Sequence, residues 1–506
     1  MTDLLKQLEK TVPPEKAVLS DGTRVVSLKQ LTKEVDHFSG ILKKLAVSRL
    51  ALYADNSIDW LVVDLACQKL NICLLPLPDY FSNEQLVHTL NSSAIEYIFT
   101  DQPNQLILGL PKLSLTKKLD YTTDLCFLEN TETAEKPLLP ESTQKITFTS
   151  GSTGQPKGVC LSLHQQLQQA ATLAALIDIK NPVHLCLLPL STLLENIAGI
   201  YTPWLAGGSI QIRSLAKLGY GGSRLLEPEK LLKSITEIQP DTLIVTQQLL
   251  MFLVHSVKQG WPVPNLKFVA VGGSKVAPEL LAEARKLGIP AYEGYGLSEC
   301  ASVVSLNIPN QDKPGSCGKA LPGLQLTIDD DDEIMVSGNA MLGYLNDPAS
   351  WYPSLIPTGD LGFIDADGFV HIHGRRKNLL ISSYGRNISP EWVESELLLS
   401  PLLAEAVVFG DARPFCSALI YPANDSISDM QIQSAIKQAN STLPDYAQIQ
   451  AWLRLEAPLS ADSRFMTSNG RPRREAINQF YQTQIDSLYQ QKVDQKSQQA
   501  NVSKPL

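Results

Sequence analysis

Residues 146–159 read ITFTSGSTGQPKGV. A run typical of a buried β-strand passes directly into a segment of Thr, Ser and Gly, followed by a single lysine, Lys157. Glycines let backbone N–H groups approach a phosphate, and hydroxyls and a lysine complete such an anion site. A Walker loop requires Ser or Thr directly after its lysine, whereas here Gly158 follows Lys157. From these residues alone, a phosphate-binding loop of another type and a flexible Gly/Ser loop are equal alternatives.

Apolar runs and helix-like stretches alternate on both sides of this loop. Strands are predicted at residues 49–53, 72–77, 97–100, 183–189, 242–245 and 266–271. Helices are predicted at residues 57–69, 83–90 and 277–286. Such alternation is typical of βαβ units around a mostly parallel sheet. We therefore expect a large α/β domain over residues 1–376.

The pattern changes after residue 357. Residues 363–373 read as two short strands around an Asp-Gly turn. A polar stretch, Gly-Arg-Arg-Lys at residues 374–377, then separates this hairpin from a new mixed segment. We place a domain boundary there, with a smaller domain over residues 377–480. The remaining residues, 481–506, are rich in Gln, Ser and Lys, which predicts a polar tail that frays or is disordered.

The composition limits the partners and the class of protein. The 506 residues are 44% hydrophobic and 19% charged, which suffices for the cores of at least two domains. A formal net charge of −9 argues against nucleic acid or an anionic membrane as the main partner. The N-terminus lacks the apolar stretch of a signal peptide, and the longest apolar runs are too short for a transmembrane segment. The eight cysteines are scattered without a C-x-x-C pair, so we expect reduced thiols in a cytoplasmic protein.

Four segments together resemble one family. The string TSGSTGQPKG at residues 149–158 is similar to the phosphate loop of the adenylate-forming (AMP-binding, ANL) superfamily of acyl-CoA synthetases, peptide-synthetase adenylation domains and luciferases. In the family's order follow YEGYGLSEC from residue 292, PTGDLG from residue 357 and HGRRKNLLISSYGRNISPEWVE from residue 373. These three are similar to the adenine-side motif, the ribose motif, and the hinge with the acyl-transfer loop. The resemblance implies a large N-terminal α/β domain of βαβ units with a small β-barrel-like subdomain, and a smaller, mobile α+β C-terminal domain.

The resemblance also assigns a role to each matching residue. The implied phosphate-binding residues are Thr149, Ser150, Gly151, Ser152, Thr153, Gly154 and Lys157. The residues implied to hold the adenosine are Gly273, Ser274, Gly294, Tyr295, Gly296, Ser298, Asp360 and Arg375. Glu299, with the Thr149 hydroxyl, would bind Mg²⁺, because this hard cation prefers carboxylate and phosphate oxygens. Outside this context, Glu299 would read as a charge at a helix N-terminus and Tyr295 as a core aromatic residue.

The family chemistry has two half-reactions. A carboxylate attacks the α-phosphate of ATP, pyrophosphate leaves with Mg²⁺, and the thiol of CoA then attacks the acyl-adenylate; positioning and charge neutralisation supply most of the catalysis. The residues implied to act in catalysis are Lys157, Glu299 and Arg471. In the family the small domain rotates between the half-reactions. Lys377 matches its hinge and Gly385 its pantetheine tunnel, although a glycine there would also suit an ordinary turn.

One position departs from the family pattern. Residues 467–477 read TSNGRPRREAI, where the family has Gly followed by the Lys that bridges the carboxylate and the α-phosphate. Here Arg471 follows Gly470, and its planar guanidinium is larger than an ammonium group. Adenylation could persist, slow down, or use Arg473 or Arg474 instead, and the loop could also be a solvated basic surface.

Two segments indicate the class of acid. LPLSTLLENIAG at residues 188–199 and YGLSECASVVSLN at residues 295–307 are most similar to bacterial long-chain fatty acyl-CoA synthetases. Neither segment offers a buried acidic or basic residue that would select an amino acid, so we expect a medium- or long-chain fatty acid. Ser191-Thr192 replaces a common Ala-His pair, which leaves the chain length open. His164 and His184 are expected to be structural or to lie beside the nucleotide.

Three functions remain open from the sequence. The first is a ligase that uses ATP, Mg²⁺ and CoA, with small molecules as its partners. The second is a fatty acyl-AMP ligase that loads the phosphopantetheinyl arm of an acyl carrier protein. The third is an ATP- and acyl-binding protein whose adenylation is impaired by Arg471, against which the retained Glu299, Asp360 and Lys377 argue.

Overall fold

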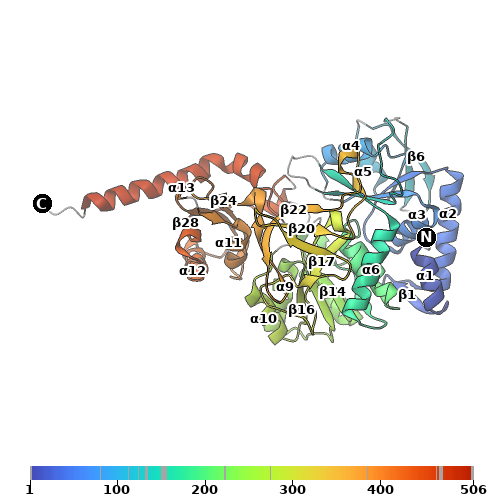
Figure 1. The fold of residues 1–506 in the computed structure, drawn as a ribbon, viewed down its shortest axis with the longest axis horizontal. Coiled ribbons are helices and arrows are strands. Elements are labelled where there is room, and N and C mark those ends of the chain that lie inside the picture. Colours follow the sequence, from blue (N-terminus) through green and yellow to red (C-terminus); the bar gives the residue numbers. More distant parts are fainter. Residues whose placement is uncertain are drawn as a thin grey trace.

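The computed structural model is elongated, with two large sheets towards one end and a smaller α+β unit towards the other (Figure 1). It describes residues 3–79, 81–111, 113–122, 125–131, 135–149, 156–221, 224–273, 275–384, 386–462, 464–466 and 471–502. Seven of the expected site residues lie outside the described residues, namely Ser150, Gly151, Ser152, Thr153, Gly154, Ser274 and Gly385.

The first sheet has nine strands in the order β18-β17-β16-β15-β14-β10-β11-β1-β2. Their bounds are β1 (Ala17–Ser20), β2 (Val25–Ser27), β10 (Val183–Leu185), β11 (Ser209–Gln211), β14 (Thr242–Val245), β15 (Phe268–Val271), β16 (Ala291–Leu297), β17 (Ser302–Leu306) and β18 (Lys319–Ala320). The strands from β1 to β16 in this order are parallel, whereas β2 at one edge and β17 with β18 at the other are antiparallel to their neighbours. The parallel pairing expected from the sequence is confirmed for the centre of this sheet.

The second sheet has eight strands in the order β21-β9-β8-β4-β3-β5-β7-β6. Their bounds are β3 (Arg49–Tyr53), β4 (Cys73–Pro76), β5 (Tyr97–Thr100), β6 (Leu115–Asp120), β7 (Cys126–Asn130), β8 (Lys145–Thr149), β9 (Lys157–Leu161) and β21 (Gly343–Tyr344). Strands β8, β4, β3 and β5 are parallel, and β8 then turns back into antiparallel β9. The first residue of the phosphate-loop motif, Thr149, therefore ends β8, and its lysine, Lys157, begins β9.

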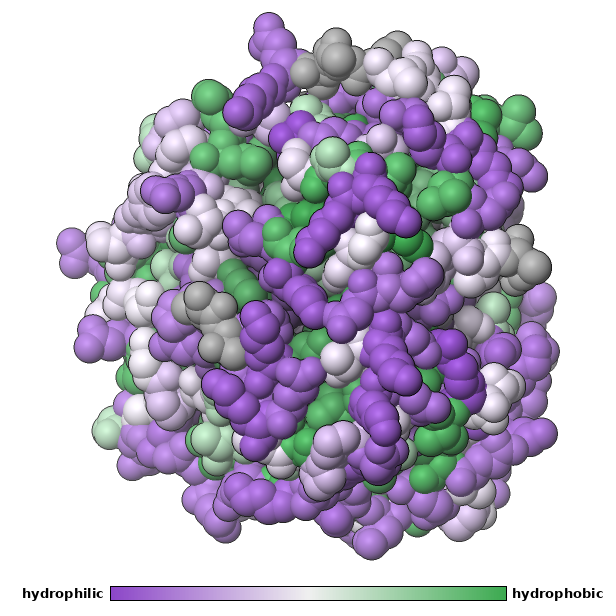
Figure 2. Space-filling model, turned by 90° about the vertical axis from the view of Figure 1, so that its right-hand side faces the viewer, coloured by the Kyte–Doolittle hydropathy of each residue, from purple (hydrophilic) through white to green (hydrophobic). Residues whose placement is uncertain are grey.

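Helices cover both sheets (Figure 1). Their bounds are α1 (Leu4–Thr11), α2 (Leu28–Lys44), α3 (Ile58–Leu70), α4 (Asn83–Ser92), α5 (Pro103–Gly109), α6 (Leu163–Ile177), α7 (Thr202–Leu205), α8 (Pro228–Ile238), α9 (Gln247–Lys258) and α10 (Pro278–Lys286). Helix α2 starts with a capping box between Ser27 and Gln30, and buries Leu31, Val35 and Phe38 along one stripe. Its other side contributes to the largely hydrophilic face of the molecule in Figure 2.

The strand predicted at residues 183–189 is shorter than expected. Strand β10 ends at Leu185, and the backbone beyond it bonds to a side chain: Asn56 donates to the carbonyl of Leu188 at 2.8 Å and accepts from the N–H of Leu190 at 2.8 Å. Residues Leu194–Tyr201 then form a π-helix, η1, a rare element often found at functional sites. The apolar run predicted an extended strand because its residues are buried, but burial does not fix the backbone pairing.

A four-stranded antiparallel sheet follows the two large ones in the sequence. It contains β19 (Gln325–Ile328), β20 (Glu333–Ser337), β22 (Ile356–Ile364) and β23 (Val370–Arg375) in that order. In the turn between β22 and β23, the N–H of Gly368 donates a 2.9 Å hydrogen bond to the carbonyl of Asp365, and Gly368 has a φ of +83°. The predicted Asp-Gly hairpin is thus confirmed, since glycine adopts this φ without strain.

The C-terminal unit packs a three-stranded sheet against helices. It contains β24 (Leu380–Ile381), β25 (Asn387–Ile388), α11 (Pro390–Leu397), β26 (Leu403–Phe409), β27 (Cys416–Pro422), α12 (Asp429–Asn440), β28 (Ile449–Arg454) and α13 (Arg474–Val502). Helix α13 extends beyond residue 481, where the sequence predicted a polar tail that frays or is disordered. The difference has a physical reason, because Ile485 and Tyr489 are buried against Phe415 and Phe409.

All eight cysteines are buried and free. In the described part of the chain, none of the helices combines the length with the apolar character that crossing a bilayer requires.

Candidate active site

The hairpin of β8 and β9 brings two predicted site residues together. Thr149 ends β8 and pairs directly with Lys157, the first residue of β9. The exposed Lys157 side chain and the Thr149 hydroxyl therefore lie close together at the two ends of the phosphate-loop motif. An ammonium group and a hydroxyl on adjacent strand ends suit the binding of an anion.

Glu299 reaches the same region from the first sheet. It lies in the short 3₁₀ turn Ser298–Cys300 between β16 and β17, and its carbonyl accepts from the N–H of Met341 at 2.6 Å. Its Oε1 accepts a 2.9 Å hydrogen bond from the hydroxyl of Tyr344. The Nζ of Lys157 lies 5.2 Å from the centroid of the Tyr344 ring. Tyr344 thus connects the expected Mg²⁺ ligand with the expected phosphate lysine, a role that no pattern in the sequence indicated.

Asp360 binds two other predicted site residues at once. Its Oδ2 accepts from the hydroxyl of Tyr295 at 2.8 Å, and its Oδ1 accepts from Nε of Arg375 at 2.8 Å. The β22–β23 hairpin pairs Asp360 with Arg375, while Tyr295 comes from β16 in the first sheet. Asp360 is buried and Tyr295 is partly buried. The ribose and adenine residues implied by the resemblance therefore form one hydrogen-bonded group.

Two members of this group, Tyr295 and Arg375, have shifted pKa values. Burial and the Asp360 carboxylate raise the pKa of Tyr295 well above its ordinary value, so the phenol stays protonated. Burial lowers the pKa of Arg375, but Asp360, Tyr295 and Glu299 raise it more, and the net shift is upward. A neutral phenol, a carboxylate and a guanidinium therefore face the cleft together.

Two different structural features explain why glycine occupies the positions expected near the nucleotide. Gly273 has a φ of +92°, and a Cβ there would meet no atom within 4 Å, so its backbone faces open space. A Cβ on Gly296 would lie 1.7 Å from the carbonyl oxygen of Ser302, and one on Gly294 would lie 2.9 Å from Leu306. The two later glycines are thus required by the close pairing of β16 with β17, where the register shifts between Tyr295 and Gly296.

Arg471 crosses from the C-terminal unit to the first sheet. Its Nε donates to the carbonyl of Gly273 at 2.6 Å, and both residues line the same cleft as Tyr295, Asp360 and Arg375. Arg474, which the sequence offered as a substitute, instead pairs with Glu394 at 2.5 Å and 2.6 Å. The structure therefore brings Arg471 to the site and commits Arg474 to an ion pair within the C-terminal unit.

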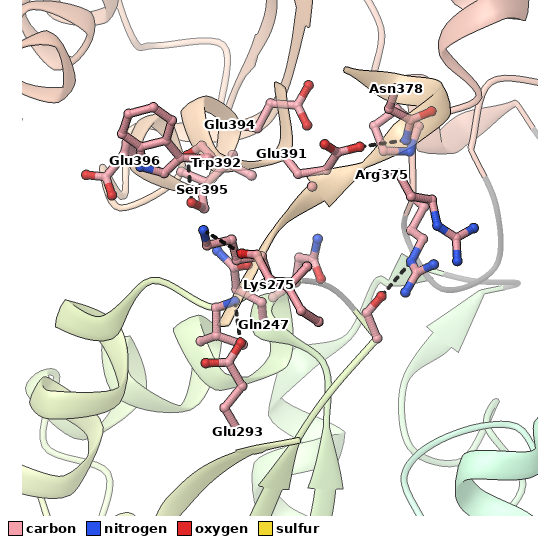
Figure 3. A pocket seen from close by; sticks show the side chains of 18 of the residues that line it. Gln247, Lys275, Glu293, Arg375, Asn378, Glu391, Trp392, Glu394, Ser395 and Glu396 are labelled. Carbon is pink, nitrogen blue, oxygen red and sulfur yellow. Dashed lines mark hydrogen bonds between the residues drawn. The ribbon is translucent and has the colours of Figure 1, made fainter. Parts of the chain in front are cut away.

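The cleft has a volume of about 360 Å³ and lies between the two parts of the chain. Figure 3 shows Glu391, Trp392 and Ser395 of α11 on one wall, with Lys275 and Glu293 of the N-terminal part opposite. The sequence had suggested none of these five residues. Burial raises the pKa of Glu293 to about 7, although the N–H of Val276 and the ammonium of Lys275 favour its carboxylate form.

The connection between the two parts contains the expected hinge residue. Lys377 lies in the 3₁₀ turn Arg376–Asn378, directly after β23. Next to it, Asn378 donates to Glu391 of α11 at 2.6 Å. On its other side Arg376 pairs with Glu333 at 3.2 Å and with Asp331 at 3.3 Å. Lys377 thus stands between a residue tied to the C-terminal unit and one tied to the four-stranded sheet.

A second, apolar cavity of about 60 Å³ lies within the N-terminal part. Its lining comes from α6, η1, α7 and the strands β14, β15 and β17, and includes Leu173, Leu194, Ala198, Phe268 and Val303. Among the described lining residues, only His184 has an ionisable side chain. A Cβ on Gly272 would lie 3.8 Å from Leu194 of this lining, and the next residue, Gly273, lines the cleft.

One expectation about the segment at residues 188–199 is wrong, although the residue concerned does not line this cavity. The segment at residues 188–199 does hold a buried acidic residue, Glu195, which the sequence interpretation excluded. Its Oε1 lies 3.0 Å from Nε2 of His184, whose Nδ1 lies 2.9 Å from the hydroxyl of Thr242. This pair gives His184 a structural environment, as expected, whereas His164 is exposed on α6.

Comparison with known proteins places both parts of the chain in the same family. The model of the AMP-binding enzymes matches residues 7–345, and that of the AMP-binding enzyme C-terminal domain matches residues 377–493. The chain is 32% identical over 253 residues to the long-chain-fatty-acid–CoA ligase FadD15 of Mycobacterium bovis, which is 44% of this chain and 42% of that protein. It is 28% identical over 458 residues to the 2-succinylbenzoate–CoA ligase of Enterococcus faecalis, which is 86% of this chain and 90% of that one.

A solved structure has the same fold. The O-succinylbenzoate coenzyme A synthetase (MenE) of Bacillus subtilis, in complex with ATP and magnesium ion, superimposes with a TM-score of 0.76 at 23% identity. The superposition covers 94% of this chain and 99% of that chain, so both the large N-terminal domain and the smaller C-terminal domain correspond. With a family match over two thirds of its length, this chain belongs to the AMP-binding enzymes.

Proposed function

We propose that the protein uses ATP to convert a carboxylic acid into its acyl-adenylate and then transfers the acyl group to the thiol of CoA. One observation carries the proposal: Asp360 joins Tyr295 and Arg375 in a cleft that Arg471 enters from the C-terminal unit. A carboxylate that can accept from ribose hydroxyls, beside a ring that can stack and two guanidinium groups, suits an adenosine phosphate. Membership of the AMP-binding enzymes supports this assignment.

The residues of the site divide the work of adenylation. Lys157 would neutralise the leaving phosphates, and Asp360 with Arg375 would hold the ribose. Arg471 would place positive charge between the attacking carboxylate and the α-phosphate. Glu299 and the Thr149 hydroxyl fit Mg²⁺, because a hard cation prefers oxygen ligands and the Tyr344 hydroxyl orients the Glu299 side chain. When bound, Mg²⁺ would neutralise charge on the departing pyrophosphate.

The apolar character of the cavity lining, rather than its volume, favours the acyl chain of a medium- or long-chain fatty acid as the substrate. Leu194 lies beside Gly272, the residue before Gly273 of the cleft, so an acid with its carboxylate in the cleft would direct its chain towards Leu194 and Ala198. The described lining of the cavity offers no Lys or Arg for a second carboxylate. A 2-succinylbenzoate-like acid is the second candidate, because the relative named for that acid aligns over 90% of its own length.

The test is an acid panel. Purified protein with ATP, Mg²⁺ and saturated acids of 6 to 18 carbons, benzoate and 2-succinylbenzoate is assayed for pyrophosphate, with mass spectrometry of the acyl-adenylate. We expect release with the fatty acids and a thioester when CoA is added. A phosphopantetheinylated acyl carrier protein in place of CoA distinguishes the carrier-loading alternative. Binding of ATP without pyrophosphate from any acid would overturn the proposal and would favour a binding protein impaired at Arg471.

A further inference from the structure

A lysine and an aspartate are completely buried at the junction of the two large sheets. Lys145, the first residue of β8, and Asp64 of α3 have side-chain exposures of 0% and 1%, and Nζ lies 3.0 Å from Oδ1. Burying such a pair is costly unless further hydrogen bonds satisfy it. Since neither residue reaches the cleft or the apolar cavity, the proposed chemistry does not use them.

The further bonds all come from the π-helix η1. Nζ of Lys145 donates to Oδ1 of Asn196 at 2.6 Å and to the hydroxyl of Tyr201 at 2.8 Å. Tyr201 in turn donates to Oδ2 of Asp64, and the Asn196 amide donates to the same oxygen at 3.3 Å. Gln68, one turn after Asp64 on α3, donates to the Tyr201 hydroxyl at 2.9 Å.

The spacing of these two partners matters. Asn196 and Tyr201 are five residues apart, and in an α-helix such residues point about 140° apart around the axis. In a π-helix, hydrogen bonds join residues five apart, so their side chains lie on nearly the same face. One ammonium group can therefore bind both side chains only while this segment is π-helical. The buried ion pair favours the π form over the α form.

Residues of η1 other than Asn196 and Tyr201 line the apolar cavity. Leu194 and Ala198 line the cavity, and between them Glu195 is fixed to His184 of β10. A Cβ on Gly199 would lie 2.6 Å from Glu195 and 2.9 Å from His184, so this side has no room for adjustment. A change from π to α would shift the register along η1 and place a different residue where Ala198 faces the cavity.

We propose that Lys145 and Asp64 are positioning residues that hold η1 in its π-helical form and so determine which acids the apolar cavity accepts. The inference rests on the proposed function for the identity of the ligand, but not for the effect on η1. Through its hydrogen bonds to Asn196 and Tyr201, the ion pair connects β8, which leads to the phosphate-loop motif, with η1, which lines the cavity.

The test uses a variant that leaves no unpaired charge. Asp64→Asn/Lys145→Met removes both charges, and Tyr201→Phe keeps the ion pair but removes one of its links to η1. The matched control is Gln166→Met, because Gln166 is also fully buried and bonds at 2.9 Å to Gln144, the neighbour of Lys145. Circular dichroism melts confirm that each variant is folded at the assay temperature.

Two measurements are made on these proteins. Hydrogen exchange followed by mass spectrometry needs no turnover, and we expect the amides of residues 194–202 to exchange roughly tenfold faster in both test variants than in the control and the wild type. The second is kcat/KM across the acid panel. The ratio between the preferred acid and one four carbons shorter should fall roughly tenfold in the test variants, because a loosened cavity discriminates less well.

The outcomes separate this inference from the proposed function. Unchanged exchange over residues 194–202 would overturn the inference even if the wild type turned over no acid. A uniform fall of kcat/KM for all acids, with the ratio kept, would reduce Lys145 and Asp64 to a purely stabilising role and would also overturn it. Absence of pyrophosphate release by the wild type itself contradicts the proposed function, whereas the exchange measurement still decides the role of the ion pair.

Discussion

The hydroxyl of Tyr295 donates a 2.8 Å hydrogen bond to Asp360, although the two residues lie 65 positions apart in the chain. The bond joins the first large sheet to the four-stranded sheet, and Arg375 donates to the other oxygen of the same carboxylate. Because Asp360 is the shared acceptor, its charge fixes the orientation of both neighbours. The nucleotide would then bind to a group that is already ordered.

The first prediction concerns this acceptor. Asp360→Asn should weaken ATP binding on the order of 100-fold, because one substitution removes the charged acceptor that serves Arg375, Tyr295 and the ribose. Titration with a fluorescent ATP analogue measures the change. Asp365→Asn is the control, since Asp365 lies at the other end of the same hairpin and pairs with Lys313 at 2.7 Å. Equal loss of affinity in both variants would mean that the hairpin, and not the carboxylate, is responsible.

A second prediction isolates the hydroxyl of Tyr344. Tyr344→Phe keeps the ring beside Lys157 but removes the hydrogen bond to Glu299. The Mg²⁺ concentration for half-maximal ATP binding should rise roughly tenfold, as for other groups that orient a metal ligand. The control is Tyr352→Phe, because Tyr352 is exposed and its hydroxyl accepts from the N–H of Glu141 at 2.8 Å, away from Glu299 and Lys157. A Mg²⁺ requirement equal to that of the wild type would contradict this role.

Sequence motifs predicted one half of the site better than the other. Asp360 and Arg375 lie in a hairpin whose Asp-Gly turn is legible, so their pairing follows from local structure. Tyr344 belongs to the two-residue strand β21, and its contact with Glu299 depends on how the two large sheets pack. No periodicity encodes such a contact.

The π-helix was missed for a related reason. Residues 194–201 are mostly apolar, and that pattern fits any buried element. The π form depends on Lys145, which lies about fifty positions earlier and bonds to Asn196 and Tyr201. The central parallel strands were predictable because their order follows from βαβ units, whereas the antiparallel edges depend on long-range pairing.

The third prediction addresses Arg471. Arg471→Lys should lower the rate of pyrophosphate release about tenfold, because a shorter ammonium side chain cannot keep the bond to the Gly273 carbonyl and also reach the phosphate. Single-turnover release at saturating ATP measures the step. Arg464→Lys is the matched control, as Arg464 pairs with Asp462 on the surface. A gain in rate with Lys at position 471 would instead identify arginine as an impairment.

The fourth prediction follows from the buried carboxyl of Glu293. Its folded-state pKa of about 7 lies above the ordinary glutamate value of 4.5, so between these pH values the folded protein holds a proton that the unfolded chain has released. Its contribution to stability is therefore complete below pH 4.5 and is lost as the pH rises through 7, by about 3 kcal/mol. Glu293→Gln keeps an acceptor for the N–H of Val276 and has no proton to lose.

Urea unfolding at pH 5 and pH 8 checks the sign. The wild type should lose about 2.5 kcal/mol more of its free energy of unfolding between these pH values than Glu293→Gln does, because a part of the total is already lost at pH 5. Glu279→Gln is the control, because Glu279 also lines the cleft but is exposed, and it should follow the wild type. If the wild type and Glu293→Gln changed in parallel, Glu293 would have to be ionised in the folded protein throughout this range. The carboxylate would then depend on Lys275 to offset its burial, and Lys275→Met should destabilise the protein more at pH 8 than at pH 5.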